Sequence, residues 1–307
     1  MNKNSIVIIF FLLLFVAQMP IMAQGEEEYP FTYMVGDVNV TLLSEGQQQG
    51  NVNILTGVTE SILSQYAPEG TFPNAINTFL IETSENTILV DAGLGRKLFS
   101  NLEVCEKKPE DINVVLLTHM HGDHIGGLLQ DGKKNFPNAK LYISRPEHDY
   151  WMSDEAMQNV PENRRAGFVQ AREVIAAYKD NLSLFTPGEI DEEKQEILPG
   201  IQGVAAYGHT PGHTVYLLES DESRLLIWGD LTHAMPVQIP SPQVATTYDL
   251  DSAKAIESRQ RLLKYVSENK IPVGGMHIEF PGMATIKGNL SDGYKYILTC
   301  TCEGVFR

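Results

Sequence analysis

A cluster of potential metal ligands directly follows a short apolar run in the first half of the chain. Residues 113–118 read NVVLLT, which is typical of a buried strand, and residues 119–124 read HMHGDH. Three imidazoles and one carboxylate therefore lie within six residues, and Gly122 allows a sharp turn among them. These side chains are ligands that suit Zn²⁺. The pattern predicts a metal site at a strand end, with a histidine-rich surface loop as the alternative interpretation.

Three later segments also place histidine or aspartate after predicted strands. They read GHTPGHT at 208–214, WGDLTH at 228–233 and GGMH at 274–277. Each alone is a weak signal, because a lone histidine or aspartate is more often structural than catalytic. Their order and shared position at strand ends predict that they complete the site begun by residues 119–124. Asp91, at the end of another predicted strand, is a candidate to orient a metal-bound histidine.

The remaining chain alternates between predicted strands and helices. Residues 251–269 form the clearest helix, because Asp251 or Ser252 can cap it and apolar residues recur at helical spacing. Residues 155–178 are helix-rich, with a break expected near Pro161. Beside residues 113–118, strands are expected at 33–43, 77–83, 87–91, 139–144, 181–185, 201–207, 214–219, 224–228 and 294–299. The alternation predicts one α/β domain with helices outside sheets.

The N-terminus has the pattern of a secretory signal peptide. Lys3 precedes an apolar run at residues 5–16, and Ala23 offers a small residue at the cleavage position. The run is short for a membrane span, so we expect no stable membrane anchor, although an uncleaved anchor is the alternative. We therefore predict a signal peptide at 1–23, a single domain at 24–307, and a periplasmic or secreted protein.

The net charge and the number of cysteines limit which partners and which kind of scaffold the chain can have. Lys plus Arg number 23 against 39 Asp plus Glu, a formal charge of −16, which argues against a broad nucleic-acid surface. Three cysteines are too few for a disulfide-built scaffold. We interpret Cys300 and Cys302 as strand residues, and a bridge from one of them to Cys105 stays open. The expected partner is a small-molecule substrate, and a homodimer is compatible with the sequence.

Taken together, HxHxDH, GHTPGH, GD and the late GMH resemble the metallo-β-lactamase superfamily, from about Asn77 to the C-terminus. The resemblance implies a four-layer αββα sandwich that holds two Zn²⁺ per chain. Carried over by motif position, it implies a first metal on His119, His121 and His213. It implies a second metal on Asp123, His124 and His277, with Asp230 bridging both. His209 is then expected to orient its turn.

Residues 228–238 and 275–282 narrow the resemblance to the secreted methyl parathion hydrolase group and its acyl-homoserine lactonase relatives. That group implies a dinuclear zinc hydrolase whose metal-bridging hydroxide opens a lactone or related ester, with N-acyl homoserine lactones as candidates and phosphotriesters as a side activity. Asp230, where dizinc β-lactamases carry Cys or Ser, argues against β-lactam hydrolysis. His121, where diiron flavoproteins carry Glu, favours zinc. His233 replaces a tyrosine found in many lactonases.

These expectations assign roles around the metals. Asp123 is expected to shuttle a proton, and His233 to donate a hydrogen bond to the substrate or to serve only in packing. The predicted substrate wall, for which core packing is the alternative, consists of Tyr150, Trp151, Phe168, Met235 and Phe280. Two other functions stay open: hydrolysis of another bond, such as a β-lactam or thioester, and a non-catalytic metal-binding protein.

Overall fold

The computed structural model describes residues 30–190 and 196–299. The predicted signal peptide, Cys300 and Cys302 lie outside the described residues. Cys105 is half-buried and forms no disulfide within the described part of the chain. No helix among the described residues is both long enough and apolar enough to cross a membrane.

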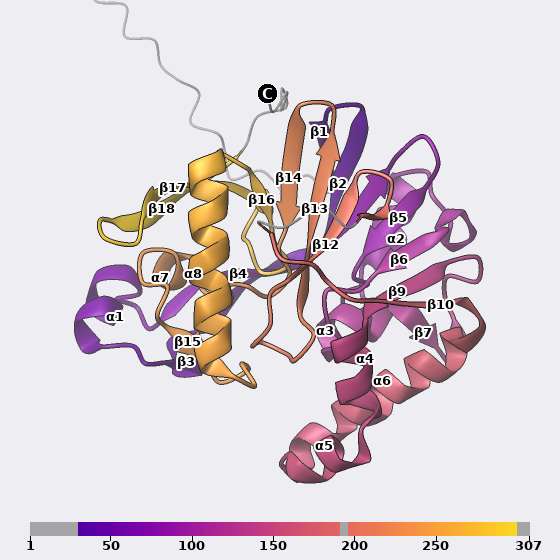
Figure 1. Cartoon of the computed structure of the whole chain (residues 1–307), viewed down its shortest axis with the longest axis horizontal. Coiled ribbons are helices and arrows are strands. Elements are labelled where there is room, and N and C mark those ends of the chain that lie inside the picture. The colour runs from indigo at the N-terminus through magenta and orange to yellow at the C-terminus, as the bar shows by residue number, and fades with distance from the viewer. Residues whose placement is uncertain (1–29, 191–195, 300–307) are drawn as a thin grey trace, which may run out of the picture.

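Most strands of the described chain belong to two seven-stranded sheets (Figure 1). The first sheet has the order β1 (Phe31–Val35), β2 (Val38–Asn51), β4 (Thr71–Glu82), β5 (Thr87–Val90), β6 (Val114–Leu116), β9 (Lys140–Ser144) and β10 (Leu182–Phe185). The second has the order β11 (Glu196–Leu198), β12 (Ile201–Ala205), β13 (Thr214–Ser220), β14 (Ser223–Ile227), β16 (Val273–Gly274), β17 (Met283–Asn289) and β18 (Gly293–Leu298). Two small ribbons pair β3 (Leu55–Thr56) with β15 (Ala245–Thr246) and β7 (Leu129–Gln130) with β8 (Lys133–Lys134).

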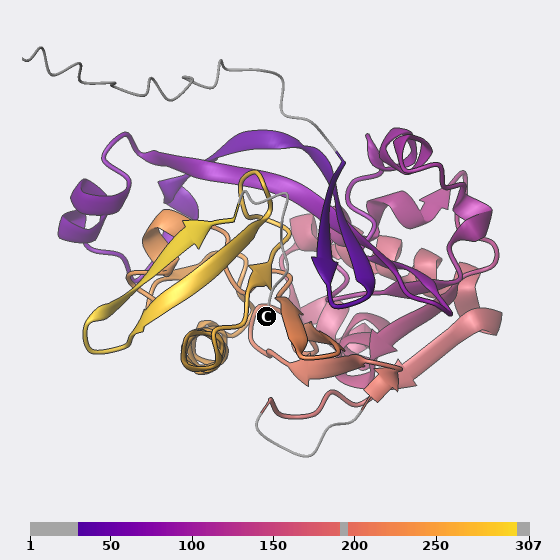
Figure 2. The same ribbon diagram turned by 90° about the horizontal axis from the view of Figure 1, so that it is seen from above.

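The two sheets pack face to face, with helices on both outer faces (Figure 2). Side chains such as Phe79 and Leu116 from the first sheet and Tyr216 and Ile227 from the second form the apolar layer between them. The outer face of the first sheet is covered by α2 (Leu98–Val104), α4 (Arg145–Met152) and α6 (Arg165–Tyr178). The outer face of the second is covered by α8 (Ser252–Asn269). This arrangement confirms the predicted αββα sandwich.

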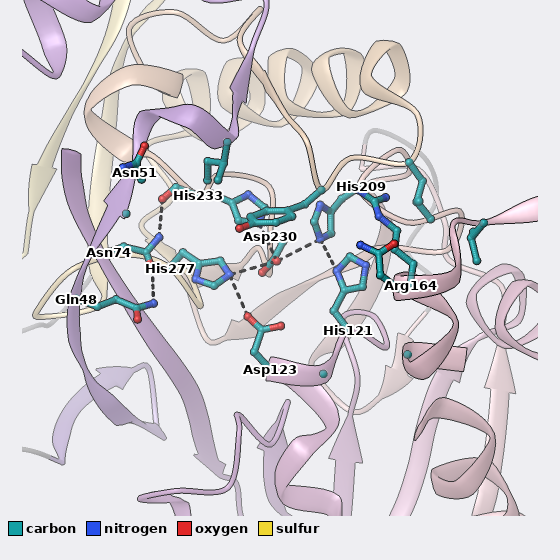
Figure 3. A pocket seen from close by; sticks show the side chains of 18 of the residues that line it. Gln48, Asn51, Asn74, His121, Asp123, Arg164, His209, Asp230, His233 and His277 are labelled. Carbon is teal, nitrogen blue, oxygen red and sulfur yellow. Dashed lines mark hydrogen bonds and ion pairs between the residues drawn. The ribbon is translucent and has the colours of Figure 1, made fainter. Parts of the chain in front are cut away.

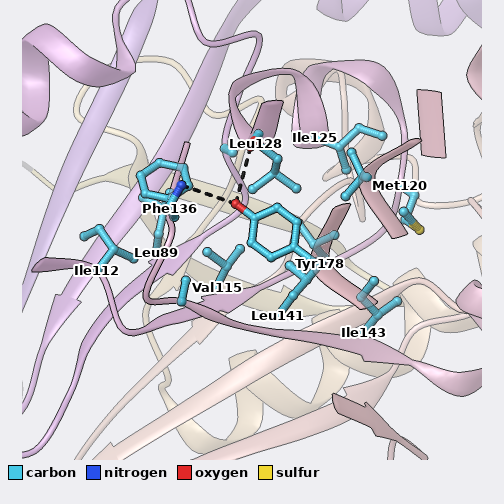
Figure 4. Packing of buried hydrophobic residues seen from close by; sticks show 14 of the residues in the cluster. Leu89, Ile112, Val115, Met120, Ile125, Leu128, Phe136, Leu141, Ile143 and Tyr178 are labelled. Atoms are coloured by element: carbon cyan, nitrogen blue, oxygen red, sulfur yellow. Dashed lines mark hydrogen bonds between the residues drawn. The ribbon is translucent and has the colours of Figure 1, made fainter. Parts of the chain in front are cut away.

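Two of the outer helices, α8 and α4, begin at a side-chain cap. Asp251 caps α8, because its side chain accepts from the Lys254 amide at 3.1 Å. Ser144 caps α4, accepting from the Glu147 amide at 3.3 Å. Tyr178 ends α6 inside the core, where its hydroxyl donates to the Leu128 carbonyl at 3.3 Å (Figure 4). The remaining described helices are α1 (Glu60–Tyr66), α3 (Gly122–Ile125), α5 (Asp154–Asn159) and α7 (Met235–Gln238).

The first predicted strand differs from the structure in two respects. Residues 33–43 were expected to form one strand, but Gly36 adopts a φ of 56° and turns the chain between β1 and β2. β2 then continues to Asn51, well beyond the predicted end, by pairing with β4 along its whole length. The break expected near Pro161 separates α5 from α6, as predicted.

Candidate metal centre

Loops from both sheets meet at one end of the sandwich. HMHGDH follows β6 in the first sheet and leads into α3. In the second sheet, residues 206–213 precede β13, Asp230 follows β14, and His277 follows β16. Histidine and aspartate side chains from these loops converge on a single space (Figure 3).

One group of potential ligands contains His119, His121, His209 and Asp230. Nδ1 of His121 lies 3.0 Å from Nε2 of His119 and 2.9 Å from Nε2 of His209. Nε2 of His209 lies 3.2 Å from Oδ2 of Asp230. These separations are close to the roughly 3.3 Å between two nitrogens that share one tetrahedral zinc. The group is thus shaped to hold one ion.

A second group contains Asp123, His124 and His277. Nε2 of His277 lies 3.7 Å from Oδ2 of Asp123, and Nε2 of His124 lies 3.9 Å from Oδ1 of Asp123. Asp230 connects the two groups, because its Oδ1 lies 3.1 Å from His124 Nε2 and its Oδ2 lies 3.2 Å from His277 Nε2. The arrangement therefore offers two neighbouring positions for cations with one shared carboxylate.

The unsatisfied polar atoms of this cluster test whether it suits a metal. Nε2 of His124 and Oδ1 of Asp230 are buried and make no hydrogen bond within the described part of the chain, although they face each other. Burial alone would raise the pKa of Asp230, but the surrounding histidines, His124 and His277 foremost, hold it well below its usual range. A buried carboxylate and buried ring nitrogens without partners fit a bound divalent cation.

The structure departs from the predicted ligand set at His213. Nδ1 of His213 donates to the Ala206 carbonyl at 2.9 Å, and its Nε2 accepts from the Asp230 amide at 3.0 Å. Both ring nitrogens are thereby used by the backbone, which leaves no lone pair for a metal. His209, expected to orient the turn, instead points its Nε2 into the first group. The two histidines of GHTPGH thus exchange the roles that the resemblance implied.

Two buried carboxylates orient ligands of the cluster. Oδ2 of Asp91 lies 2.6 Å from Nδ1 of His124, as the sequence interpretation of Asp91 anticipated. Oδ1 of Asp249 lies 3.0 Å from Nδ1 of His209, a contact that sequence reasoning missed. Burial would raise the pKa of Asp249, but its hydrogen bond with His209 lowers it to about 2. Such carboxylate–histidine pairs fix the ring orientation of metal ligands.

His233 lies over the shared carboxylate. Its Nε2 is 3.1 Å from Oδ2 of Asp230, and its ring stacks on His277 with centroids 4.8 Å apart. Gln238 accepts from the His233 amide at 2.7 Å, and Asn74 donates to its carbonyl at 2.8 Å. Burial lowers the pKa of His233 to about 4. The imidazole is therefore neutral and held at the floor of a cavity.

That cavity has a volume of about 770 Å³. Tyr150, Trp151 and Phe168 line it, as predicted, while Trp151 and Phe168 also belong to the buried core against the first sheet, which was the alternative. Met235 does not line it, because this side chain is buried in the core beneath the second sheet. Phe280 is also absent from the lining and packs on Phe31, with ring centroids 5.8 Å apart. The predictions for Met235 and Phe280 are therefore wrong.

The wall across from the aromatic side chains is polar and was not anticipated. It carries the amides of Gln48, Gln49, Asn51 and Asn74 from β2 and β4 (Figure 3). Gln48 donates to the Asn74 side chain at 3.0 Å, which links this wall to the loop of His233. Arg164 and Tyr248 complete the rim near His209 and His233. The cavity thus offers apolar and hydrogen-bonding surfaces above the same ligands.

Comparisons with known proteins agree with this geometry. The N-acyl homoserine lactonase of Bacillus cereus is 27% identical over 193 residues, covering 54% of this chain and 67% of that protein. Exodeoxyribonuclease WalJ of Streptococcus pneumoniae is 51% identical over only 53 residues, 17% of this chain and 20% of that protein. The chain thus matches only part of the length of these curated relatives.

Solved structures match nearly the whole fold. Hydrolase AbOPH of the β-lactamase superfamily superposes with a TM-score of 0.81 at 27% identity, covering 91% of this chain and 100% of that one. AidC, a dizinc quorum-quenching lactonase solved with the product N-hexanoyl-L-homoserine, gives a TM-score of 0.80 at 24% identity, covering 89% and 98%. The sequence profile of the metallo-β-lactamase superfamily matches residues 71–269. The chain therefore belongs to the metallo-β-lactamase superfamily.

Proposed function

We propose that this protein is a dizinc hydrolase that opens lactones or related esters, with N-acyl homoserine lactones as the leading substrates. The observation that carries the proposal is the pair of ligand groups joined by Asp230 at the floor of a cavity of about 770 Å³. His119, His121 and His209 would hold one ion, and Asp123, His124 and His277 the other. The lactonase activity named for the Bacillus cereus relative supports the substrate class.

Bound divalent ions would supply Lewis acidity at the ester carbonyl and would lower the pKa of water to about 7. The chain's own residues supply orientation and proton transfer. Asp123 faces the cavity with a side chain that is one-third exposed. Burial would raise the pKa of Asp123, but His124 and His277 lower it, so it is an ionised carboxylate that can accept a proton. From this place it can pass that proton to the leaving alkoxide.

His233 and the two cavity walls would position the substrate. The His233 imidazole lines the cavity with its Nε2 3.1 Å from Oδ2 of Asp230, so the single N–H of the neutral ring would be shared between that carboxylate and a substrate oxygen. Trp151 and Phe168 offer an apolar surface to an acyl chain, and Gln48 and Asn51 offer hydrogen bonds to its polar head. This division of the lining favours an amphipathic substrate with one polar end.

Metal analysis of the purified chain with a substrate panel tests the proposal. The panel contains N-hexanoyl homoserine lactone, nitrocefin, a thioester, an aryl phosphotriester and linear DNA. We expect two zinc ions per chain and lactone turnover, both abolished by Asp230→Asn. Chelation should remove activity and added Zn²⁺ should restore it. One ion or none per chain would refute the dinuclear centre. Hydrolysis of another compound of the panel, without hydrolysis of the lactone, would refute the proposed substrate class.

Two parts of the proposal rest on sequence alone. We propose that residues 1–23 are a signal peptide, so that the mature protein is a single domain located in the periplasm or outside the cell. Mass spectrometry of protein recovered from the expressing cells would show the mature N-terminus. A chain that retains residues 1–23 would contradict this part.

A further inference from the structure

Glu147 is a buried carboxylate beside the metal loops that the proposed mechanism does not use. It lies in the first turn of α4, and only 1% of its surface is exposed. An ionised carboxylate in such a place is costly unless hydrogen bonds satisfy its oxygens. The partners of Glu147 therefore indicate why the fold retains it.

Four donors surround the Glu147 carboxylate. Oε1 accepts from the Met120 amide at 2.9 Å and from the Trp151 indole at 2.6 Å. Oε2 accepts from the Thr210 hydroxyl at 2.6 Å and from the Gly212 amide at 3.0 Å. A carboxylate offers about four acceptor positions, so this set saturates it. Burial raises the pKa of Glu147, and the hydrogen bonds from Thr210 and Trp151 oppose that shift.

Three of these four donors belong to the two loops that carry the first ligand group. Met120 lies between His119 and His121, and Thr210 directly follows His209. Trp151 belongs to the aromatic cavity wall, and its ring lies edge-on to His121 with centroids 5.9 Å apart. Asp123, His124 and His277, the ligands of the second group, supply none of the four donors. Glu147 thus holds residues adjacent to ligands of the first group and reaches the second group only through the HMHGDH loop that both groups share.

The loop that carries His209 packs tightly against α4 at this point. A Cβ atom on Gly212 would lie 2.0 Å from the Glu147 backbone nitrogen. The Ser144 hydroxyl also donates to the Gly212 carbonyl at 2.6 Å. The close contact fixes how the loop packs on the first turn of α4. The Glu147 carboxylate supplies the acceptor for the loop's Thr210 and Gly212 donors at this contact.

We propose that Glu147 is a positioning residue that sets the separation of His209 from His119 and His121, and so determines the metal affinity of the first ligand group. The inference rests on the metal centre proposed above, and it assigns to this group a stronger dependence on α4 than to the second group, which is connected to Glu147 only through the HMHGDH loop.

Glu147→Gln tests the idea with almost no change of shape. The Met120 amide and the Trp151 indole can only donate, so the amide oxygen of glutamine must face them. Its NH₂ group then faces the Gly212 amide, which is also a donor, so the loop of His209 loses that hydrogen bond and keeps only one in which the Thr210 hydroxyl accepts. We expect metal affinity at one of the two sites to fall by about 10- to 100-fold, the range for residues that orient ligands.

The measurements are Co²⁺ and Zn²⁺ stoichiometry against a competing chelator, the Co²⁺ absorption spectrum, and urea unfolding. Glu147→Gln should retain one tightly bound ion of two. In a His277→Ala background, where the first group alone is complete, Glu147→Gln should remove the remaining ion. Thr210→Val deletes one donor but keeps the charge, and it should weaken the same site less.

Asn101→Asp provides a matched control. It is also an isosteric exchange of amide and carboxylate at a buried side chain, and that side chain donates to the Ser44 carbonyl, away from both metal loops. We expect it to lower stability and to leave both ions bound. If Glu147→Gln kept two tightly bound ions, the inference about Glu147 would be refuted while the proposed metal centre would stand. Equal metal loss in Asn101→Asp would have the same consequence. A wild-type chain that binds no metal would overturn the proposed centre as well.

Discussion

Replacing His209 and His213 one at a time separates the two roles that the structure gives to the histidines of GHTPGH. His209 points its Nε2 at the cluster, 2.9 Å from His121 Nδ1 and 3.2 Å from Asp230 Oδ2. Both nitrogens of His213 are bonded to the backbone. Loss of His209 should therefore act on the metal, and loss of His213 on the fold.

The two expected effects differ in kind and can be estimated. His209→Ala removes one ligand outright, so metal affinity at the first site should fall by at least about 100-fold, above the range for orienting residues. His213→Ala leaves the Ala206 carbonyl and the Asp230 amide buried without partners, at about 1–3 kcal/mol each. The free energy of unfolding should then fall by about 2–6 kcal/mol, out of the roughly 5–15 kcal/mol of a typical domain.

The assay is metal content per folded chain after dialysis and gel filtration, together with urea unfolding of the metal-free protein. His213→Ala should keep two ions per folded chain while its unfolding midpoint falls. His209→Ala should keep one ion. If His213→Ala lost an ion at unchanged stability and His209→Ala kept both, the assignment read from these hydrogen bonds would be refuted.

Three further predictions concern side chains around the cluster. Asp249→Asn should weaken metal binding by about 10- to 100-fold, because it weakens the contact that orients His209; chelator competition measures it, and unchanged affinity would contradict it. His233→Ala should lower kcat/KM for a lactone by at least about tenfold with two ions still bound; a value within about threefold of wild type would rule out a substrate contact. Gly212→Ala should cost at least about 3 kcal/mol of unfolding free energy, because its Cβ would overlap the Glu147 backbone; a urea midpoint equal to wild type would contradict that packing.

The sequence allowed prediction of the places where the site is built. An apolar run followed by HMHGDH predicts both β6 and the loop after it, and Asp230 after β14 follows the same logic, whereas β16 before His277 was not predicted as a strand. Asp91 was predictable as an orienting residue because it directly follows β5, which pairs with β6. Polar residues at the ends of neighbouring strands come together whatever the details of the loops.

The choice between His209 and His213 could not be read in the same way. Both follow a glycine in one short motif, and only the hydrogen bond of His213 to the Asp230 amide, 17 residues away, distinguishes them. Glu147 and Thr210 lie 63 residues apart, and no periodicity connects them. The amide wall was missed because the strand was predicted to end at residue 43, whereas pairing with β4 extends it to Asn51. Each of these features depends on tertiary partners that leave no local pattern.

The three orienting carboxylates connect the metal centre to separate parts of the sandwich. Asp91 follows β5 in the first sheet, Glu147 lies on α4 outside it, and Asp249 precedes α8, which covers the second sheet. The ligands themselves come from both sheets, so the full set exists only after the apolar layer between the sheets has packed. Metal that binds the full set therefore stabilises the assembled sandwich and neither sheet alone. It follows that substitutions in that layer, far from any ligand, will weaken metal binding as they loosen the packing of the two sheets.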